Sequence, residues 1–353
     1  MLGTGYYDFD KPLDAKIPGL ENFKGTTVHP QFWPEDLDYK GKKMVIIGSG
    51  ATAVTIVPAV VDEGVGSVTM LQRSPSYILS MPQRKPTDPI PLFERILPTS
   101  ASLRLKRLGF VFIGWAIYLF CQAFPARARR IIAKEAKKVL PRDFPMDPHF
   151  APKYNPWDQR LCFCPDNDFY LSLGTGRAHV VTDTIKRVVS DGIELASGQK
   201  LDADIIVTAT GLNLSFCGKI DVTVDKKPVH IPDQYLWRTA MITGLPNLSV
   251  SIGYINASWA LGSDTTARLT TRLIKYMLDN GYTSVIPEIT PEEMKDPLSP
   301  LALASTYVKA SQHKIPHAGR TGPWKPRNNF FQDSWNADRA DLRQGLKFSK
   351  VST

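Results

Sequence analysis

Short apolar runs separated by a glycine-containing turn form the clearest pattern along the chain, between residues 43 and 71. Lys43–Ile47 is mostly apolar, which is typical of a strand buried on both faces. A turn at 48–53, a helical stretch to about Glu63 and a second apolar run at Val68–Leu71 follow. This order predicts one β-α-β unit with parallel strands.

The rest of the chain shows weaker patterns. Further strands are expected at 178–182, at 192–195 and 200–201 as the arms of a hairpin, at 204–211 and at 248–252. A helix is expected at 268–280, where Leu269, Leu273 and Met277 share one face. Residues 1–40 are punctuated by Pro and Gly and are expected to form an irregular linker. The chain after Pro287 is Pro-rich and poorly periodic.

Residues 84–150 interrupt the alternation and are expected to be a mostly helical insertion. Within them, 108–124 is almost wholly apolar and has Arg and Lys residues on both sides. At 17 residues this run is short for a membrane span, which needs about 20. A buried or groove-lining helix is favoured, with contact to a membrane surface and a true span as alternatives.

The turn at 48–53 reads Gly-Ser-Gly-Ala-Thr-Ala between a predicted strand and a predicted helix. The first Gly allows a tight turn, the second lets the backbone approach a pyrophosphate, and the small Ala53 lets the helix pack on the strand. The N–H groups at the helix N-terminus attract phosphate. In this context the pattern favours dinucleotide binding over a merely structural turn.

The residues after the second strand indicate which nucleotide is bound. An NAD-preferring site has Asp or Glu there to bind the ribose 2′-hydroxyl, but this chain has Gln72, Arg73 and Ser74. The Arg73 guanidinium is suited to a 2′-phosphate. We therefore expect NADPH rather than NADH, although Arg73 as an ordinary surface charge is the alternative.

Composition narrows the class of protein. The net charge is +9, yet no basic run is interleaved with aromatic residues in the manner of a nucleic-acid module, so a nucleic-acid partner is not expected. The four cysteines form no regular framework, and the spacing of Cys162 and Cys164 fits neither a redox pair nor a zinc site. No metal is expected. The start of the chain has no secretory signal pattern, which favours a cytoplasmic location, with membrane association left open.

A longer motif precedes the glycine turn. Phe23, Gly25, His29, Trp33 and Pro34 are spaced as F-x-G-x-x-x-H-x-x-x-W-P. This spacing resembles the fingerprint of the flavin-dependent Baeyer–Villiger monooxygenases, and Trp33 fits them better than the related flavin-containing monooxygenases. Similar motifs run from about Gly3 to Arg327 and look like the branch that includes the mycobacterial ethionamide-activating enzyme. They are Gly3–Tyr7, Gly48–Ala53, Gln72–Pro75, Asn155–Arg160, Ala209–Leu212 and Asn256–Trp259.

The resemblance implies an α/β fold with two Rossmann-like domains, of which the FAD domain is discontinuous. Residues 1–40 would then be the linker carrying the fingerprint, and 41–212 the NADPH-binding domain with its helical insertion at 84–150. Residues 213–335 would be the returning part of the FAD domain, and 336–353 a tail. The cofactor-binding residues implied are Gly48, Ser49, Gly50, Ala51, Thr52, Ala53, Val54, Gln72, Arg73, Ser74, Thr210 and Gly211.

The chemistry implied by the resemblance is monooxygenation with NADPH, FAD and O2. The reduced flavin would form a C4a-peroxyflavin, which converts a ketone into an ester or lactone, in a role within secondary metabolism; oxygenation of a sulfide or an amine is the runner-up. The family's Arg that stabilises the peroxide corresponds to Arg160. His29 and Trp33 would shape the cofactor geometry rather than transfer protons. A disulfide reductase is disfavoured, because no redox Cys pair follows a glycine loop.

The family also has an earlier glycine loop for FAD, and we find no such strand-turn-helix pattern before residue 41. The sequence therefore looks N-terminally truncated. Three explanations are open: a fragment of an active enzyme, which we favour; a short, flavin-free protein that binds NADPH but catalyses no oxidation; or a chain that binds FAD with a partner chain.

Overall fold

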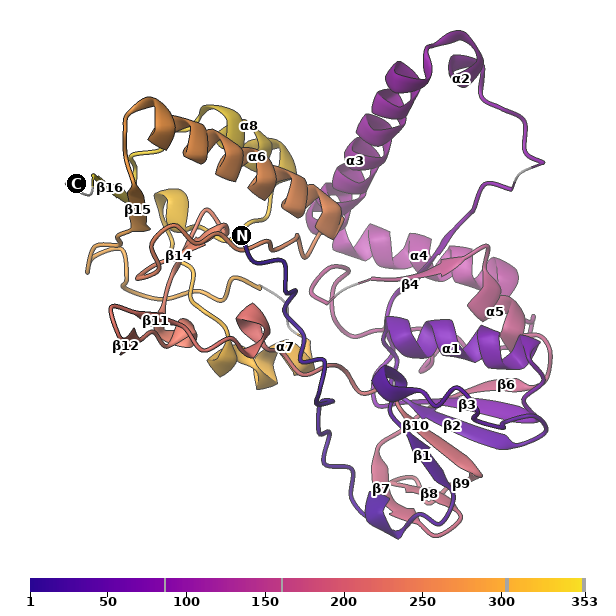
Figure 1. Ribbon diagram of the computed structural model, residues 1–353. Helices are drawn as coiled ribbons and strands as arrows, with labels where there is room; N and C mark the ends of the chain where they lie inside the picture. Colours follow the sequence, from indigo (N-terminus) through magenta and orange to yellow (C-terminus); the bar gives the residue numbers. More distant parts are fainter. Residues whose placement is uncertain (86, 160, 302–304, 351–353) are drawn as a thin grey trace. The chain divides into compact units, whose positions relative to one another are not determined.

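The chain folds into two units, Pro12–Gly211 and a second one made of Met1–Lys11 with Leu212–Thr353, which we describe separately. Figure 1 shows the computed structural model, in which the structure describes all residues except 86, 160, 302–304 and 351–353.

A five-stranded parallel sheet forms the centre of the Pro12–Gly211 unit. Its strands are β1 (Thr26–Val28), β2 (Lys43–Ile47), β3 (Ser67–Gln72), β6 (Ala178–Thr182) and β10 (Ile205–Thr208), in the spatial order β1-β10-β2-β3-β6. The four strands other than the edge strand β1 are largely apolar, as the sequence predicts for a sheet covered on both faces. Ile46, Val68 and Val207 are fully buried or nearly so.

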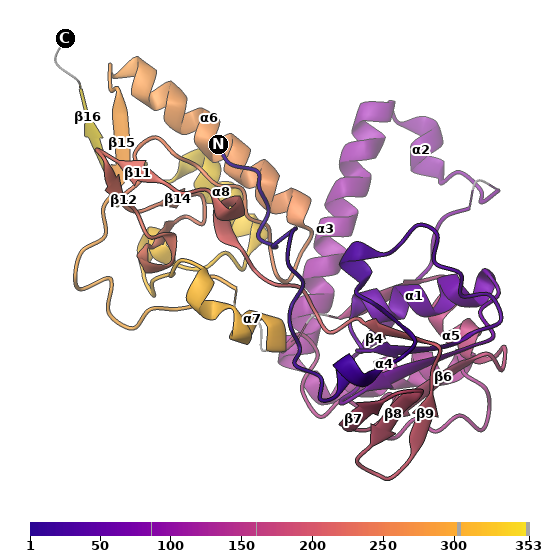
Figure 2. The same ribbon diagram turned by 60° about the horizontal axis from the view of Figure 1, so that its bottom comes forward.

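The two faces of this sheet are covered differently (Figure 2). On one face lie the helices α1 (Ala51–Asp62) and α5 (Asp168–Leu173), whose apolar side chains join the largest core cluster. On the other face an antiparallel meander packs through Val188, Ile193 and Leu201. The meander strands are β7 (Ile185–Val189), β8 (Gly192–Leu195) and β9 (Lys200–Asp202). Both faces of the sheet are thus covered, and the loops leave it at the ends of its strands.

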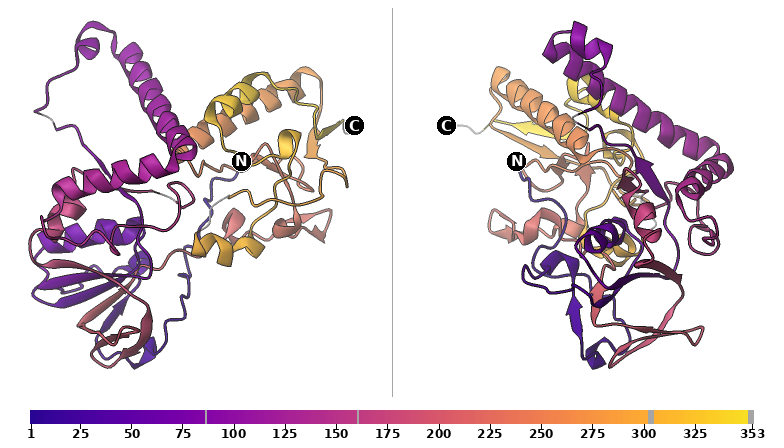
Figure 3. Two further views of the ribbon diagram at one scale, coloured as in Figure 1. Left: turned by 180° about the vertical axis from the view of Figure 1, so that it is seen from behind. Right: turned by 90° about the vertical axis from the view of Figure 1, so that its right-hand side faces the viewer.

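The insertion predicted at 84–150 is helical. It contains α2 (Leu92–Ile96), α3 (Thr99–Ala123) and α4 (Pro125–Val139), and β4 (Ile78–Met81) and β5 (Cys162–Pro165) form a small parallel pair beside it. Within the unit, α4 lies over β4 and α5, while α2 and α3 project away from the sheet (Figure 3).

Over the described residues, no single helix has both the length and the apolar character of a membrane span. α3 and α4 taken together meet the test, but they meet at a bend of 117°.

The other unit combines helices with short strand pairs. Its long helix α6 (Trp259–Asp279) packs against α8 (Phe330–Arg339), and Arg272 on α6 donates hydrogen bonds to the carbonyls of Ala337 and Ala340. The remaining elements are β11 (Thr223–Val224), β12 (Lys227–Pro228), β13 (Leu236–Trp237), β14 (Met241–Ile242), β15 (Ser284–Pro287), β16 (Leu346–Ser349) and α7 (Thr306–Ala310). Short 3-10 helices lie in this unit at Phe216–Lys219, Ile231–Asp233, Gln312–Lys314 and Gly322–Trp324, and in the Pro12–Gly211 unit at Leu20–Asn22 and Pro30–Phe32.

Several segments differ from the sequence-based expectation. The helix expected at 268–280 begins earlier, because α6 covers Trp259–Asp279. The run at 108–124, favoured as a buried or groove-lining helix, lies on α3, of which only Ser102 and Cys121 are buried. The linker at 1–40 is not wholly irregular, because Thr26–Val28 pairs with Ile205–Val207 as the edge strand of the sheet. The tail at 336–353 contains the end of α8 and β16, which pairs with β15. The strand expected at 248–252 forms only isolated bridges, Met241 with Ser249 and Leu2 with Val250. The partners of Thr26–Val28, of β16 and of Val250 are distant in sequence, so local periodicity carries no signal for these pairings.

All four cysteines are free and buried. Burial raises the pKa of Cys162 to about 12 and that of Cys164 and Cys217 to about 11, and it also raises the pKa of Cys121. We therefore expect the folded protein at pH 8 to react with a thiol reagent far more slowly than the protein unfolded in urea, since only the thiolate attacks. Rapid labelling of any cysteine in the folded protein would contradict this burial.

Candidate dinucleotide-binding site

The carboxyl ends of four neighbouring strands gather the predicted site residues at one edge of the sheet. His29 follows β1, Thr210 follows β10, Gly48 follows β2 and Arg73 follows β3. The chain runs from β2 to β3 on one side, while β10 lies on the other side of β2. The end of β2 is therefore a point where the strand order reverses, and ligands of open parallel sheets bind at such points.

Gly48 makes the closest approach in the loop. Its φ is 136°, a conformation that residues with a side chain rarely adopt. A methyl group at this position would overlap the backbone carbonyl of Ala209, at the end of the adjacent strand β10. Gly50 is different: its φ is −79°, and a methyl group there would meet no atom within 4 Å. The first Gly is thus required by the protein itself, whereas the space beside the second one is open.

The N-terminus of α1 begins at this open space. Gly50 is the N-cap, and neither a capping side chain nor an acidic residue occupies the first turn of this helix. Gly50, Ala51 and Thr52 are exposed, while the side chains of Ala53 and Val54 are buried in the core. The first turn of α1 therefore contributes no carboxylate of its own to compete for its backbone N–H groups, which suits a phosphate.

At the end of β3, Gln72 is buried in the fold, whereas the two residues that follow the strand are accessible. The Gln72 amide is buried and donates to the carbonyl of His149 and to Thr182 Oγ1, at 2.8 and 2.9 Å. Arg73 and Ser74 are exposed. Since the backbone N–H of Gly48 donates to the Leu71 carbonyl at 2.9 Å, the glycine loop and the Arg73 segment leave the sheet side by side.

A set of hydroxyl contacts that the sequence analysis missed joins the glycine loop to its neighbours. Ser49 Oγ donates to the Ser74 carbonyl at 2.9 Å and lies 3.0 Å from Ser76 Oγ. The next residue, Tyr77, donates its phenol to the Tyr154 carbonyl at 2.6 Å, and burial raises its pKa to about 12. These contacts hold the loops after β2 and β3 together and connect them to the segment that leads to Arg160.

His29 caps a short helix. Its Nδ1 accepts from the backbone N–H of Gln31 at 3.2 Å, so in the neutral ring the proton is on Nε2. Partial burial lowers the pKa of His29, although the backbone of Gly211 opposes this shift. Trp33 ends the same short helix and packs edge-to-face on Tyr39, with ring centroids 6.1 Å apart. These contacts suit positioning rather than proton transfer.

Two further predicted residues lie after β10. Thr210 has a buried hydroxyl that meets no hydrogen-bond partner in the part of the chain that the structure describes, and Gly211 has a φ of 117°. A buried hydroxyl without a partner is costly unless a bound molecule satisfies it, so its place next to the glycine loop fits a nucleotide. Arg160 lies outside the described residues.

The other unit contains a buried guanidinium that sequence reasoning also missed. Arg327 donates to the carbonyls of Ile252 and Gly262, at 2.6 and 3.0 Å, and to Thr266 Oγ1 at 3.1 Å. It lies over the ring of Tyr254, whose hydroxyl donates to Asp333 at 2.9 Å. Because a solitary Arg in a Pro-rich segment has no local pattern, only the fold reveals this cluster.

Together, the parallel sheet and the open glycine cradle at its point of reversal define a dinucleotide-binding protein. Curated relatives narrow the class. The FAD-containing monooxygenase EthA of Mycobacterium tuberculosis is 41% identical over 353 residues, covering 99% of this chain and 71% of EthA. The probable FAD-binding monooxygenase AlmA of Acinetobacter baylyi is 42% identical over 349 residues, covering 98% of this chain and 69% of AlmA. The chain therefore belongs to the family of FAD-containing monooxygenases represented by EthA and AlmA.

Solved structures give the same fold. A steroid monooxygenase bound to NADP matches with a TM-score of 0.66 at 18% identity, covering 98% of this chain and 74% of that one. An open form of cyclohexanone monooxygenase matches with a TM-score of 0.64 at 18% identity, covering 99% of this chain and 73% of that one. No family model matches the sequence. The structural neighbours confirm the predicted Rossmann-like α/β fold.

The two glycines of the cradle should respond differently to the same substitution. We expect Gly48→Ala to lower the melting temperature markedly, because the added methyl group overlaps the Ala209 carbonyl and forces a disfavoured φ. Gly50→Ala should melt within a few degrees of the wild type, since its methyl group enters open space. Thermal unfolding followed by circular dichroism tests this, and equal losses of stability would contradict the geometry of the loop.

Proposed function

We propose that the Pro12–Gly211 unit binds NADPH at the edge of the sheet where β2 ends. The observation that carries this proposal is the open cradle beside Gly50 at the N-terminus of α1, with Arg73 on the neighbouring strand end. The first-turn N–H groups would hold the pyrophosphate, and the exposed Arg73 and Ser74 would hold the 2′-phosphate. The unpartnered hydroxyl of Thr210 would bond to the nucleotide at the same edge.

We further propose that this chain works with FAD as a monooxygenase. Among the described residues, the loop at 48–53 is the one glycine cradle that joins a strand of the parallel sheet to a long helix, so these residues fit one dinucleotide. When bound, the flavin supplies the activation of O2, and the unit bearing α6 and α8 would be the returning part of its domain.

The reaction we propose is the oxidation of a ketone to an ester or lactone. It consumes one ketone, one O2, one NADPH and one proton, and yields the ester, NADP⁺ and water, so one oxygen atom lies between the carbonyl carbon and the migrating carbon. Structural neighbours named as cyclohexanone and steroid monooxygenases support a ketone substrate. Oxygenation of sulfur or nitrogen would use the same cofactors, and assays with cyclic ketones, aryl ketones and sulfides separate these reactions.

Substitution of Arg73 tests the choice of nicotinamide nucleotide. We expect Arg73→Ala to weaken NADPH binding by about ten- to a hundredfold, the effect of losing a charged hydrogen bond to phosphate, while NADH binding changes little. Calorimetric titration with both nucleotides measures this difference.

The matched control for that experiment is Arg177→Ala. Arg177 is also exposed and also lies next to a strand of the sheet. It precedes β6, however, and is therefore at the amino ends of the strands, opposite the carboxyl ends that bear Arg73. We expect it to bind both nucleotides as the wild type does. Equal losses of NADPH and NADH affinity in Arg73→Ala would remove Arg73 from the 2′-phosphate site.

Substitution of Arg160 tests the oxygenation step separately from nucleotide binding. In the flavin-loaded protein, we expect Arg160→Ala to lose ester formation while NADPH still reduces the flavin at nearly the wild-type rate, because a guanidinium is proposed to stabilise negative charge on oxygen. Stopped-flow absorbance measures flavin reduction, and gas chromatography measures the ester. Continued ester formation at the wild-type rate would exclude Arg160 from the mechanism.

A further inference from the structure

The helix α3 is unusual because so little of it is buried. Of its 25 residues, only Ser102 and Cys121 are buried. Its exposed large apolar side chains include Leu108, Phe110, Phe112, Ile113, Leu119 and Phe120, and Phe110 is 72% exposed. A row of exposed apolar residues of this length is rare on a protein that faces only water, and it indicates a surface that contacts another apolar phase.

The charges carried by α3 and α4 themselves are almost all of one sign, although Lys106 is paired with Glu94 of α2 at 2.6 Å. From Thr99 to Val139, which covers α3 and α4, the chain has nine Lys and Arg residues and a single acidic one, Glu135. This part of the chain therefore carries a net charge of +8, against +9 for the whole chain. The basic residues lie on both sides of the apolar stretch at 108–124. Arg104, Lys106 and Arg107 precede it, and the others follow it from Arg127 onward.

The second helix adds a feature suited to an anionic amphiphile. A hollow of about 410 Å³ on α4 is lined by Lys134, Lys137 and Lys138 together with Ala133 and Met146. The aliphatic parts of these lysines line the hollow together with Ala133 and Met146, and the ammonium group of Lys138 is paired with Glu135 at 2.7 Å. Ammonium groups beside an apolar lining can bind a ligand that has a negative charge next to hydrocarbon. A phospholipid has this arrangement at the boundary of its headgroup.

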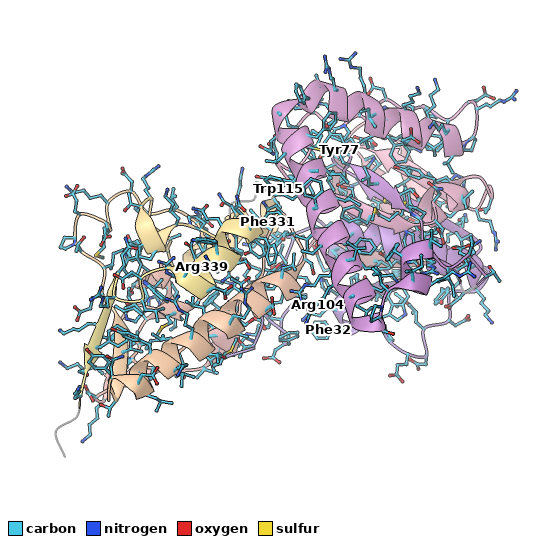
Figure 4. The ribbon with its side chains drawn as sticks, turned by 90° about the horizontal axis from the view of Figure 1, so that it is seen from above. Phe32, Tyr77, Arg104, Trp115, Phe331 and Arg339 are labelled. Atoms are coloured by element: carbon cyan, nitrogen blue, oxygen red, sulfur yellow. The ribbon has the colours of Figure 1, made fainter. Side chains whose placement is uncertain are left out.

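From these observations we propose that α3 and α4 bind the surface of an anionic lipid bilayer. The apolar side chains of α3 enter the boundary between headgroups and acyl chains, and the basic residues of both helices bind the phosphates. Arg104 and Trp115, labelled in Figure 4, identify α3 in a view from above. The projection of α2 and α3 away from the sheet in Figures 1 and 3 leaves this surface accessible within its unit. The charge favours a lipid bilayer over a second copy of this chain, whose corresponding surface would be equally positive.

Vesicle sedimentation tests the proposal on the whole chain. The probes are vesicles of phosphatidylcholine alone and vesicles in which about one-third is phosphatidylglycerol. We expect binding to the anionic vesicles only, weakened by high salt. Phe110→Ser/Phe112→Ser should reduce the partition coefficient about tenfold or more, because both phenyl groups are exposed and would be the ones inserted. Lys134→Glu/Lys137→Glu should do the same through charge.

Matched substitutions on the other unit serve as controls. Leu278→Ser/Ile274→Ser removes two exposed apolar residues of α6, and Lys226→Glu/Lys227→Glu reverses two exposed charges. Both should bind vesicles as the wild type does. Circular dichroism and NADPH titration check that each variant is folded. Neither α3 nor α4 contributes to the nucleotide cradle, so a failure of nucleotide binding can be distinguished from a failure of vesicle binding.

Quenching of Trp115 by lipids brominated along the acyl chains gives a second measurement. We expect quenching in anionic vesicles that is lost largely in Trp115→Phe. Three results would overturn the proposal: equal binding to neutral and anionic vesicles, no binding to either, or a self-association in ultracentrifugation that is abolished by Phe110→Ser/Phe112→Ser without any vesicle binding. The last result would assign the α3 surface to a contact between copies of the chain.

Discussion

The close approach of Gly48 to the carbonyl of Ala209 is the contact on which the candidate site depends. It is possible because β2 and β10 are adjacent in the sheet and because the loop has no side chain at that point. The contact fixes where α1 begins, and therefore where its first-turn N–H groups lie relative to Arg73 and Thr210. Any shift of this turn would move the proposed phosphate-binding groups together with the helix.

Around that contact, residues that are buried and stabilise the fold lie within one or two positions of residues that are exposed to solvent. Gln72 has its amide hydrogens bonded to His149 and Thr182 inside the unit, while the next residue, Arg73, is exposed. Likewise, Ala53 is packed in the core, but Ala51 is open to solvent. The same strand end thus stabilises the fold and presents chemistry, which is how a rigid sheet can hold a binding site at its edge.

Much of the Pro12–Gly211 unit could be predicted because its signals are local. The strands at 43–47 and 178–182 were predicted at their observed bounds, and the glycine spacing located the cradle. The edge strand Thr26–Val28 was missed, since three residues show no periodicity and their partner is β10. The contact of Tyr77 with Tyr154 spans 77 residues, and the contacts of Arg327 come from three separate segments, so no spacing rule could reveal either.

The buried position of Arg327 has a consequence for how the molecule is made. Its guanidinium satisfies carbonyls of Arg238, Ile252 and Gly262, all of which leave the ribosome earlier than Arg327 itself. Until Arg327 has been synthesised, those carbonyls must remain hydrated or unsatisfied, so this unit cannot complete its interior. In the described part of the chain, every strand that pairs in the sheets of the Pro12–Gly211 unit belongs to that unit. During translation it can therefore finish folding while Met1–Lys11 still waits for the segments with which it packs.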